Sequence, residues 1–358
     1  MSLKKYSAVV ICILIFLVSG IYTPAQQPEW TKDMTAANAA RQQGNYAVAE
    51  KLYKHVVDMQ EKVLGADRLE VAATLNNLAV LYQDQSMYTQ AEPLYKRSLV
   101  IWQKHPKQEN QVALCLNNLA ALHHDQNQTG EAEVEYKGAL AIWEKTHNTE
   151  SADAATTNVS LADIYHAAGR NAEAEPLYTR AIAIWEKSRK MEGAEAAGAL
   201  IKLGDIYRAE GMNDKAKPLY TRALEISEII GKAETPEAIS ALGSLGEIFS
   251  SQGNYTDAEP PLLNVLQIKE RNLGPNSLEV ASSANRLAML YYCESKYDAA
   301  EPLYKSAIRI RELNLGAKDP IVLQTLQYYA ALLRQEGRKE EAQKIEARAA
   351  RNEVSSMQ

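Results

Sequence analysis

The chain has 358 residues, of which 46% are hydrophobic, and a formal net charge of −6. This length suits two ordinary domains or one extended array, and the mildly acidic charge argues against nucleic-acid binding, which requires a basic face. The 19 tyrosines against 2 phenylalanines suit thin layers with much surface, because a tyrosine keeps one end in water.

The first residues have the pattern of a secretory signal peptide. Two lysines precede the apolar run AVVICILIFLV at residues 8–18, which is shorter than the ~18 apolar residues that a membrane span requires. We therefore expect residues 1–25 to be a signal peptide, cleaved after Gly20 or Ala25. The protein would be exported, periplasmic or extracellular, with no membrane span in the mature chain. The alternative is an uncleaved segment that anchors it to the membrane.

A period of 42 residues, with one step of 41, runs through the rest of the chain. Its marker is an alanine in a small–acidic–x–apolar signature, found at Ala49, Ala91, Ala132, Ala174, Ala216, Ala258, Ala300 and Ala342. A constant period in this range is typical of a solenoid. The sequence predicts an array over residues 30–353 with a tail at 354–358. Its repeats lie at about 30–70, 71–111, 112–153, 154–195, 196–237, 238–279, 280–321 and 322–353.

Each repeat is predicted to be a helix, a turn and a second helix. In the first half, apolar or small residues recur at i, i+3, i+4 and i+7, as in LNNLAVLY at residues 75–82, which is typical of an amphipathic helix. The second half has a similar stripe that begins at the marker alanine. Turns such as QGNY at residues 43–46 separate the halves, because glycine accepts the left-handed conformation that ends a helix. Eight repeats give about sixteen helices.

A proline recurs two residues after the marker alanine, at Pro93, Pro176, Pro218, Pro260 and Pro302. Proline inside a helix typically costs ~3 kcal/mol, because it removes a hydrogen bond and clashes with the preceding turn. Each residue advances ~100° around a helix, so the ring points almost opposite the apolar stripe. We expect the lost hydrogen bond to lie on the outer face, where it produces a shared bend.

The two helical signatures resemble the tetratricopeptide repeat. LNNLA.LY, YTQAEPLYKRSL at 88–99 and LGADRLEVA at 64–72 resemble the long repeats of kinesin light chains and their bacterial relatives. The resemblance covers roughly Trp30 to Glu353. It implies an all-α fold, an α-α superhelix of about eight helix-turn-helix repeats, whose first helices line a concave groove that usually binds peptides or proteins.

In the resembling family, the two positions before the stripe leucine face the concave side. Here they include Asn76, Asn77, Asn117, Asn118 and Asn285. Asparagine can both donate to and accept from the backbone of an extended peptide. Solvated polar residues without a binding role are the alternative.

Acidic residues follow the small residue in three consecutive repeats, at Asp163, Asp205 and Glu247. In a stacked array they would form an acidic stripe that favours a basic partner segment, and Arg208 would pair with Asp205 three residues before it. An ordinary charged helix face is the alternative. The basic residues that clamp a C-terminal carboxylate in the family are not matched.

Catalytic and metal-binding patterns are weak. His123, His124, Asp125 and His166 form the one cluster that resembles a metal site, but His123 stands in a core tyrosine position. The sequence has no nucleophile elbow, phosphate-binding glycine loop or His-Glu-x-x-His motif, so we expect no enzyme, no metal and no cofactor.

Three tryptophans stand at equivalent places near the ends of second helices, at Trp102, Trp143 and Trp185. Each continues an alanine–tyrosine stripe, which favours a core position over a stacking platform for a ligand. Cys115 and Cys293 lie in the third and seventh repeats, so we expect no disulfide between them.

The sequence therefore predicts a non-enzymatic scaffold for protein–protein interaction, a monomer that binds an extended or helical segment of a partner protein in its concave groove. The alternative is a structural subunit of a cell-envelope or secretion assembly, which docks through the convex face or the ends of the array.

Overall fold

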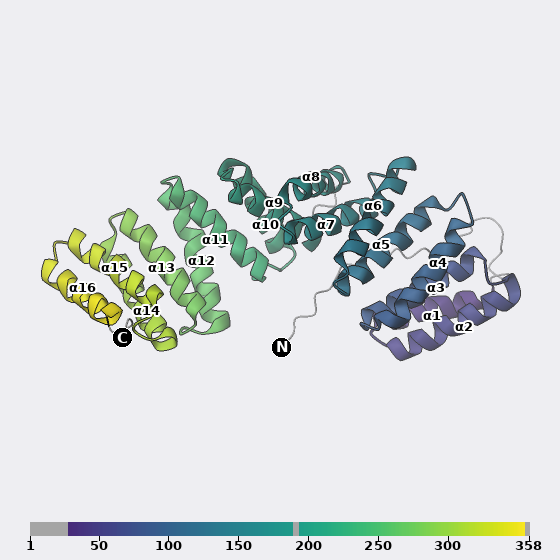
Figure 1. Cartoon of the computed structure of the whole chain (residues 1–358), viewed down its shortest axis with the longest axis horizontal. Coiled ribbons are helices and arrows are strands. Elements are labelled where there is room, and N and C mark those ends of the chain that lie inside the picture. Colours follow the sequence, from purple (N-terminus) through teal and green to yellow (C-terminus); the bar gives the residue numbers. More distant parts are fainter. Residues whose placement is uncertain (1–27, 189–192, 355–358) are drawn as a thin grey trace. The chain divides into compact units, whose positions relative to one another are not determined.

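The computed structural model describes residues 28–188 and 193–354 (Figure 1). These residues form two compact units that divide between residues 191 and 192. The first unit contains α1 (Trp30–Gln42), α2 (Tyr46–Leu64), α3 (Leu69–Asp84), α4 (Tyr88–Gln103), α5 (Glu109–Asp125), α6 (Thr129–Lys145), α7 (Ala152–Ala167) and α8 (Asn171–Lys187). The second contains α9 (Ala194–Ala209), α10 (Asn213–Ile229), α11 (Pro236–Ser251), α12 (Tyr255–Leu273), α13 (Leu278–Cys293), α14 (Tyr297–Leu315), α15 (Pro320–Gln335) and α16 (Lys339–Val354).

These sixteen helices, with no β-strand in the described residues, confirm the predicted tetratricopeptide solenoid. Within each unit every helix packs on the next helix along the chain. The first helices of neighbouring repeats also touch, since α3 contacts α5, α5 contacts α7, and α9 contacts α11. The first helices therefore form a layer of their own within each unit.

The turn between the two helices of a repeat needs one residue in the left-handed conformation. Gly44 occupies this place in the first repeat with φ of 76°. In the second repeat Ser86 adopts it with φ of 59° although it carries a side chain. The amide of the next residue, Met87, then donates to the carbonyl of Tyr82 at 2.8 Å, which satisfies an otherwise unpaired carbonyl at the end of the helix.

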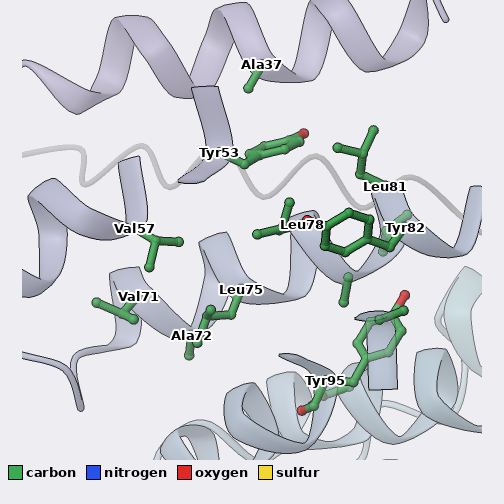
Figure 2. Packing of buried hydrophobic residues seen from close by; sticks show 14 of the residues in the cluster. Ala37, Tyr53, Val57, Val71, Ala72, Leu75, Leu78, Leu81, Tyr82 and Tyr95 are labelled. Atoms are coloured by element: carbon green, nitrogen blue, oxygen red, sulfur yellow. The ribbon is translucent and has the colours of Figure 1, made fainter. Parts of the chain in front are cut away.

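The core is built where the stripes of both helices meet. All eight marker alanines are fully buried, with exposures of 0%, so any larger side chain there would collide with a neighbouring helix. Figure 2 shows the ring of Tyr53 from α2 lying between Ala37 of α1 and Leu78 and Leu81 of α3. Each repeat thus covers the apolar face of the next, which is why a solenoid is stabilised mainly by contacts between neighbours.

The positions of the tryptophans and prolines follow from the same stripe. Trp102, Trp143 and Trp185 are buried, with exposures of 3%, 1% and 5%, so they belong to the core and offer no stacking platform. The five recurring prolines lie inside helices and are exposed, which confirms that their rings face solvent.

A hydrogen bond joins successive repeats at the glutamate that follows the marker alanine. Tyr82 in α3 donates its hydroxyl to Glu50 in α2 at 2.9 Å, and the ammonium of Lys54 lies 5.9 Å from the centre of the Tyr82 ring. We call this arrangement the repeat clasp. It recurs between Tyr165 and Glu133 at 3.1 Å and between Tyr291 and Glu259 at 2.9 Å.

The last two repeats form the clasp from a different turn of the helix. Leu333 stands where four earlier repeats have a tyrosine, and Tyr329, one helical turn before it, donates to Glu301 at 2.7 Å. Residues four apart share a helix face, so the hydroxyl reaches the same acceptor.

Other predictions concern the termini and the cysteines. The predicted signal peptide lies outside the described residues. In the described part of the chain, none of the helices has both the length and the apolar composition needed to cross a membrane. Cys115, which is buried, and Cys293, which is exposed, are both free thiols.

Candidate functional site

Two of the three predicted groove carboxylates serve as acceptors for core tyrosines. Tyr178 donates its hydroxyl to Asp163 at 2.5 Å, and Tyr220 donates to Asp205 at 2.6 Å. In each pair the tyrosine follows the aspartate by 15 residues. Burial, and secondly the bond to Asp205, raise the pKa of Tyr220 above its ordinary value. Each aspartate therefore accepts a hydrogen bond from the hydroxyl of a buried tyrosine in its own repeat, which a buried polar group requires.

The third carboxylate, Glu247 in α11, does not accept a hydrogen bond from a core tyrosine in its own repeat. Fifteen residues after it stands Leu262, which is buried and has no hydroxyl to donate. Glu247 is instead bound by two guanidinium groups. Arg286 of α13 lies 2.8 Å from it and Arg208 of α9 lies 3.5 Å from it. The expected pairing of Arg208 with Asp205 is thus replaced by a pairing with the next repeat.

A cleft opens around Glu247 in the second unit. Its volume is about 550 Å³. It is lined by the first helices α9, α11 and α13, the second helix α12, and Glu234 in the connection before α11. The lining residues are Arg208, Glu234, Pro236, Ile239, Ser240, Gly243, Ser244, Glu247, Val265, Lys269, Asn272, Leu273 and Arg286. We call this site the α11 cleft.

Small residues at two positions of α11 leave room for the cleft. Gly243 and Ser244 occupy the two places before the stripe leucine, where the second and third repeats carry paired asparagines. A Cβ added at Gly243 would meet the guanidinium of Arg286 at 3.7 Å, an ordinary contact, and no other atom within 4 Å. The α11 cleft is therefore open directly above the backbone of α11.

Positive charge exceeds negative charge in the α11 cleft. Arg208, Lys269 and Arg286 face two carboxylates, and one of these, Glu234, is bound at 2.8 Å by Arg271 outside the lining. Burial, together with repulsion from Arg286, lowers the pKa of Lys269, and attraction to Glu279 opposes this only in part. The two arginines share the one remaining carboxylate.

An apolar strip runs beside these charges. Pro236 and Ile239 come from the first turns of α11, while Val265 and Leu273 come from α12. Leu273 has 54% of its surface exposed. The α11 cleft therefore combines charged and apolar walls, as ligand sites commonly do.

The predicted asparagines in the first unit bind one another across repeats. Asn118 donates through Nδ2 to Oδ1 of Asn76 at 3.1 Å, and Asn117 accepts from the hydroxyl of Thr157 at 2.6 Å. Asn77 is half-buried, with Nδ2 3.9 Å from the sulfur of Met34. The structure brings Asn76 and Asn118 together, which uses part of their capacity to bind a peptide.

Asn285 in the second unit differs from these, since it is 8% exposed and its Oδ1 has no hydrogen-bond partner among the described residues. The residue after it, Arg286, occupies the place that Asn77 and Asn118 hold in their repeats. Arg286 was not among the groove residues predicted from the sequence, although the 42-residue register aligns it with Asn77 and Asn118.

The histidine cluster does not assemble into one site. His123 is buried, and its Nδ1 lies 2.8 Å from Glu135. Burial raises the pKa of Glu135, and the hydrogen bond to His123 opposes this shift. His124 is exposed, and His166 bonds to Asn171 at 2.9 Å. Across residues 28–188 and 193–354, no group of three or more His, Cys, Asp or Glu side chains is placed to hold a metal ion.

Comparisons with known proteins agree with this architecture. The family model described as tetratricopeptide repeat matches residues 31–104, 111–187, 195–271, 237–313 and 279–352. No curated protein matches the chain.

Several solved structures are similar to the chain at low sequence identity. The apo form of RapI is 15% identical with a TM-score of 0.55, over 80% of this chain and 98% of its own. BtubC (BKLC) from P. vanneervenii is 24% identical with a TM-score of 0.48, over 73% and 92%. A Podosopora anserina chain of nearly identical TPR-like repeats, named for the kinesin light chain, is 21% identical with a TM-score of 0.49, over 58% and 98%.

Proposed function

Because the chain belongs to the tetratricopeptide repeat family, we propose that it is a non-enzymatic scaffold that binds a segment of a partner protein on its layer of first helices. The observation that carries this proposal is the α11 cleft, a volume of about 550 Å³ bordered by three successive first helices of the second unit. An extended chain laid across these helices would contact side chains from several repeats at once. Such a site gains affinity from many modest contacts.

The composition of the cleft supports binding rather than catalysis. Its lining includes two serines, Ser240 and Ser244, but no histidine or cysteine. A serine nucleophile requires an adjacent base to activate it. The lining carboxylates are held in ion pairs, and among the described residues neither serine is hydrogen-bonded to Lys269. The chemistry available is hydrogen bonding, charge pairing and apolar contact.

The proposal includes export of the protein, and the pattern of residues 1–25 supports it. In an exported scaffold, the partner would be another protein of the envelope or the extracellular space. A structural subunit that docks through the second helices or the ends of the array remains the competing function.

A cleft-filling substitution distinguishes these functions. The full chain is panned against a random peptide library displayed on phage, and affinities of the enriched peptides are measured by titration calorimetry. Gly243→Gln places a polar side chain in the α11 cleft, while Gly130→Gln makes the same change on an open face of α6, where an added Cβ has no neighbour within 4 Å.

The proposal expects peptides that bind the wild type and the Gly130 variant equally and the Gly243 variant at least ~10-fold more weakly, the loss of about one good contact. If every enriched peptide binds both variants equally, the cleft has no binding role and the structural function gains support.

A further inference from the structure

We propose that the α11 cleft receives a side-chain carboxylate of the partner segment, which Lys269 and Arg286 bind while an apolar neighbour in the segment packs on Ile239 and Leu273. The inference rests on the proposed function and names the partner's chemistry. The partner segment would then be acidic, whereas the acidic stripe in the sequence led us to expect a basic partner segment.

An acidic partner is expected because the carboxylates of the predicted acidic stripe are already bound by other side chains in the second unit. In the second unit, Asp205 is occupied by the hydroxyl of Tyr220 at 2.6 Å. Glu247 is held by Arg286 at 2.8 Å and Arg208 at 3.5 Å. A basic side chain that entered the cleft would have to displace these partners, and it would also meet their positive charge.

Lys269 is the cation that the cleft leaves unsatisfied. It is half-buried in α12, and no carboxylate lies within 4.0 Å of its ammonium in the part of the chain that the structure describes. Its lowered pKa arises first from burial and then from Arg286, so its charged form is disfavoured in the empty cleft. A carboxylate placed between Lys269 and Arg286 would attract both cations and would therefore oppose the lowering of the Lys269 pKa.

Arg286 keeps donors for a second partner. Its Nη1 contacts Glu247, and 53% of its side chain is exposed. A guanidinium has five N–H donors in a planar fork, so one ion pair leaves hydrogen-bonding capacity for an incoming carboxylate. Charge-assisted bonds of this kind are about twice as strong as neutral ones.

The apolar strip further specifies which residues the partner segment should contain. Leu273 is 54% exposed at the end of α12 and Ile239 is half-buried in α11, and both line the same cleft as Lys269. A segment with an acidic residue next to an apolar one would use both walls. A free anion without an apolar neighbour would use only the charges.

The test begins with the peptides that the library yields on the full wild-type chain. The inference expects an excess of Asp or Glu beside an apolar residue. For one such peptide, replacing the acid by its amide should weaken binding at least ~10-fold. Lys269→Gln should weaken the acidic peptide by a similar factor and leave the amide peptide unchanged. Lys344→Gln, on exposed α16, serves as the matched control.

A charge exchange separates binding from folding. Lys269→Glu should restore binding to a peptide whose acid is replaced by lysine, which a misfolded variant could not do. The inference is overturned if enriched peptides are basic or uncharged, or if Lys269→Gln binds acidic peptides as well as the wild type. If Gly243→Gln nevertheless weakens peptide binding, the proposed function stands and only the inference about the partner's carboxylate fails. If Gly243→Gln has no effect either, both the inference and the proposed function fail.

Discussion

Lys217 of α10 lies with its ammonium 5.4 Å from the centre of the Phe249 ring in α11, at the junction where other repeats pair a glutamate with a tyrosine hydroxyl. One of the chain's 2 phenylalanines thus faces the one lysine that replaces the clasp glutamate among these junctions. Both positions therefore differ from those of the clasped junctions, and a cation–π contact, worth ~0.5–1 kcal/mol at exposed sites, takes the place of the hydrogen bond.

Restoring the repeat clasp at this junction should require both changes. We expect the free energy of unfolding of the double variant Lys217→Glu with Phe249→Tyr to exceed the value obtained by adding the two single-variant changes. The expected excess is about 1 kcal/mol, the net value of one hydrogen bond. Urea unfolding of wild type, both single variants and the double variant gives this coupling directly. Strict additivity of the single changes would show that the two positions do not form a clasp.

Two glycines of α9 should respond oppositely to the same substitution. A Cβ at Gly204 would lie 2.9 Å from the ring of Tyr220, whereas a Cβ at Gly198 would have no neighbour within 4 Å. Gly204→Ala is therefore expected to destabilise the protein by about 1–3 kcal/mol through overpacking. Gly198→Ala should stabilise it by about 0.5–1 kcal/mol through helix propensity. Thermal unfolding compares them, and equal effects would contradict the packing of α9 on α10.

The turn at Ser86 carries backbone strain that a glycine would relieve. Its φ is 59°, a conformation that costs a residue with a side chain roughly 1–2 kcal/mol, and glycine's greater freedom in the unfolded chain offsets part of this. Ser86→Gly should therefore raise stability by about 0.5–1 kcal/mol in urea unfolding. Gly169→Ala, with φ of 73° and no atom near an added Cβ, is the reverse change and should lower it. A loss of stability in Ser86→Gly would contradict the turn geometry.

Acid should weaken the repeat clasps. A hydrogen bond from Arg338, with further bonds from Lys305 and Tyr329, lowers the pKa of Glu301 from 4.5 to about 2. Because the folded state has the lower pKa, the ionised carboxylate stabilises the fold fully above pH 4.5 and loses this effect as pH falls toward about 2.

The clasp variant Glu301→Gln should therefore lower the urea midpoint at pH 7 and have a much smaller effect near pH 2. Lys344→Gln, outside any clasp, provides the control for a general charge effect. A midpoint that shifts equally at both pH values would show that the pKa of Glu301 is not lowered in the folded protein.

The sequence was sufficient for the architecture because the same physical requirement recurs in every repeat. A fully buried alanine marks the core in every repeat, and in six repeats a tyrosine stands four residues after it. The period alone therefore predicts helix pairs and the buried position of Trp143. The outward prolines follow from the same geometry, since Pro93 lies off the stripe and is exposed.

The site was less predictable because side-chain partners come from other repeats. Asp205 reads as a groove acid, yet its acceptor role depends on Tyr220, and Glu247 differs only because Leu262 lacks a hydroxyl. Arg208 was assigned to the nearest acid along the helix, while the structure joins it to Glu247 across 39 residues. Such pairings depend on how helices stack, which local spacing does not specify.

A crystal structure of the full chain with a library-derived acidic peptide tests the central claim most directly. We predict electron density for the peptide across α11, over Gly243, with its carboxylate against Lys269 and Arg286. A peptide bound on the second helices or at an end of the array, with the α11 cleft vacant, would contradict the account.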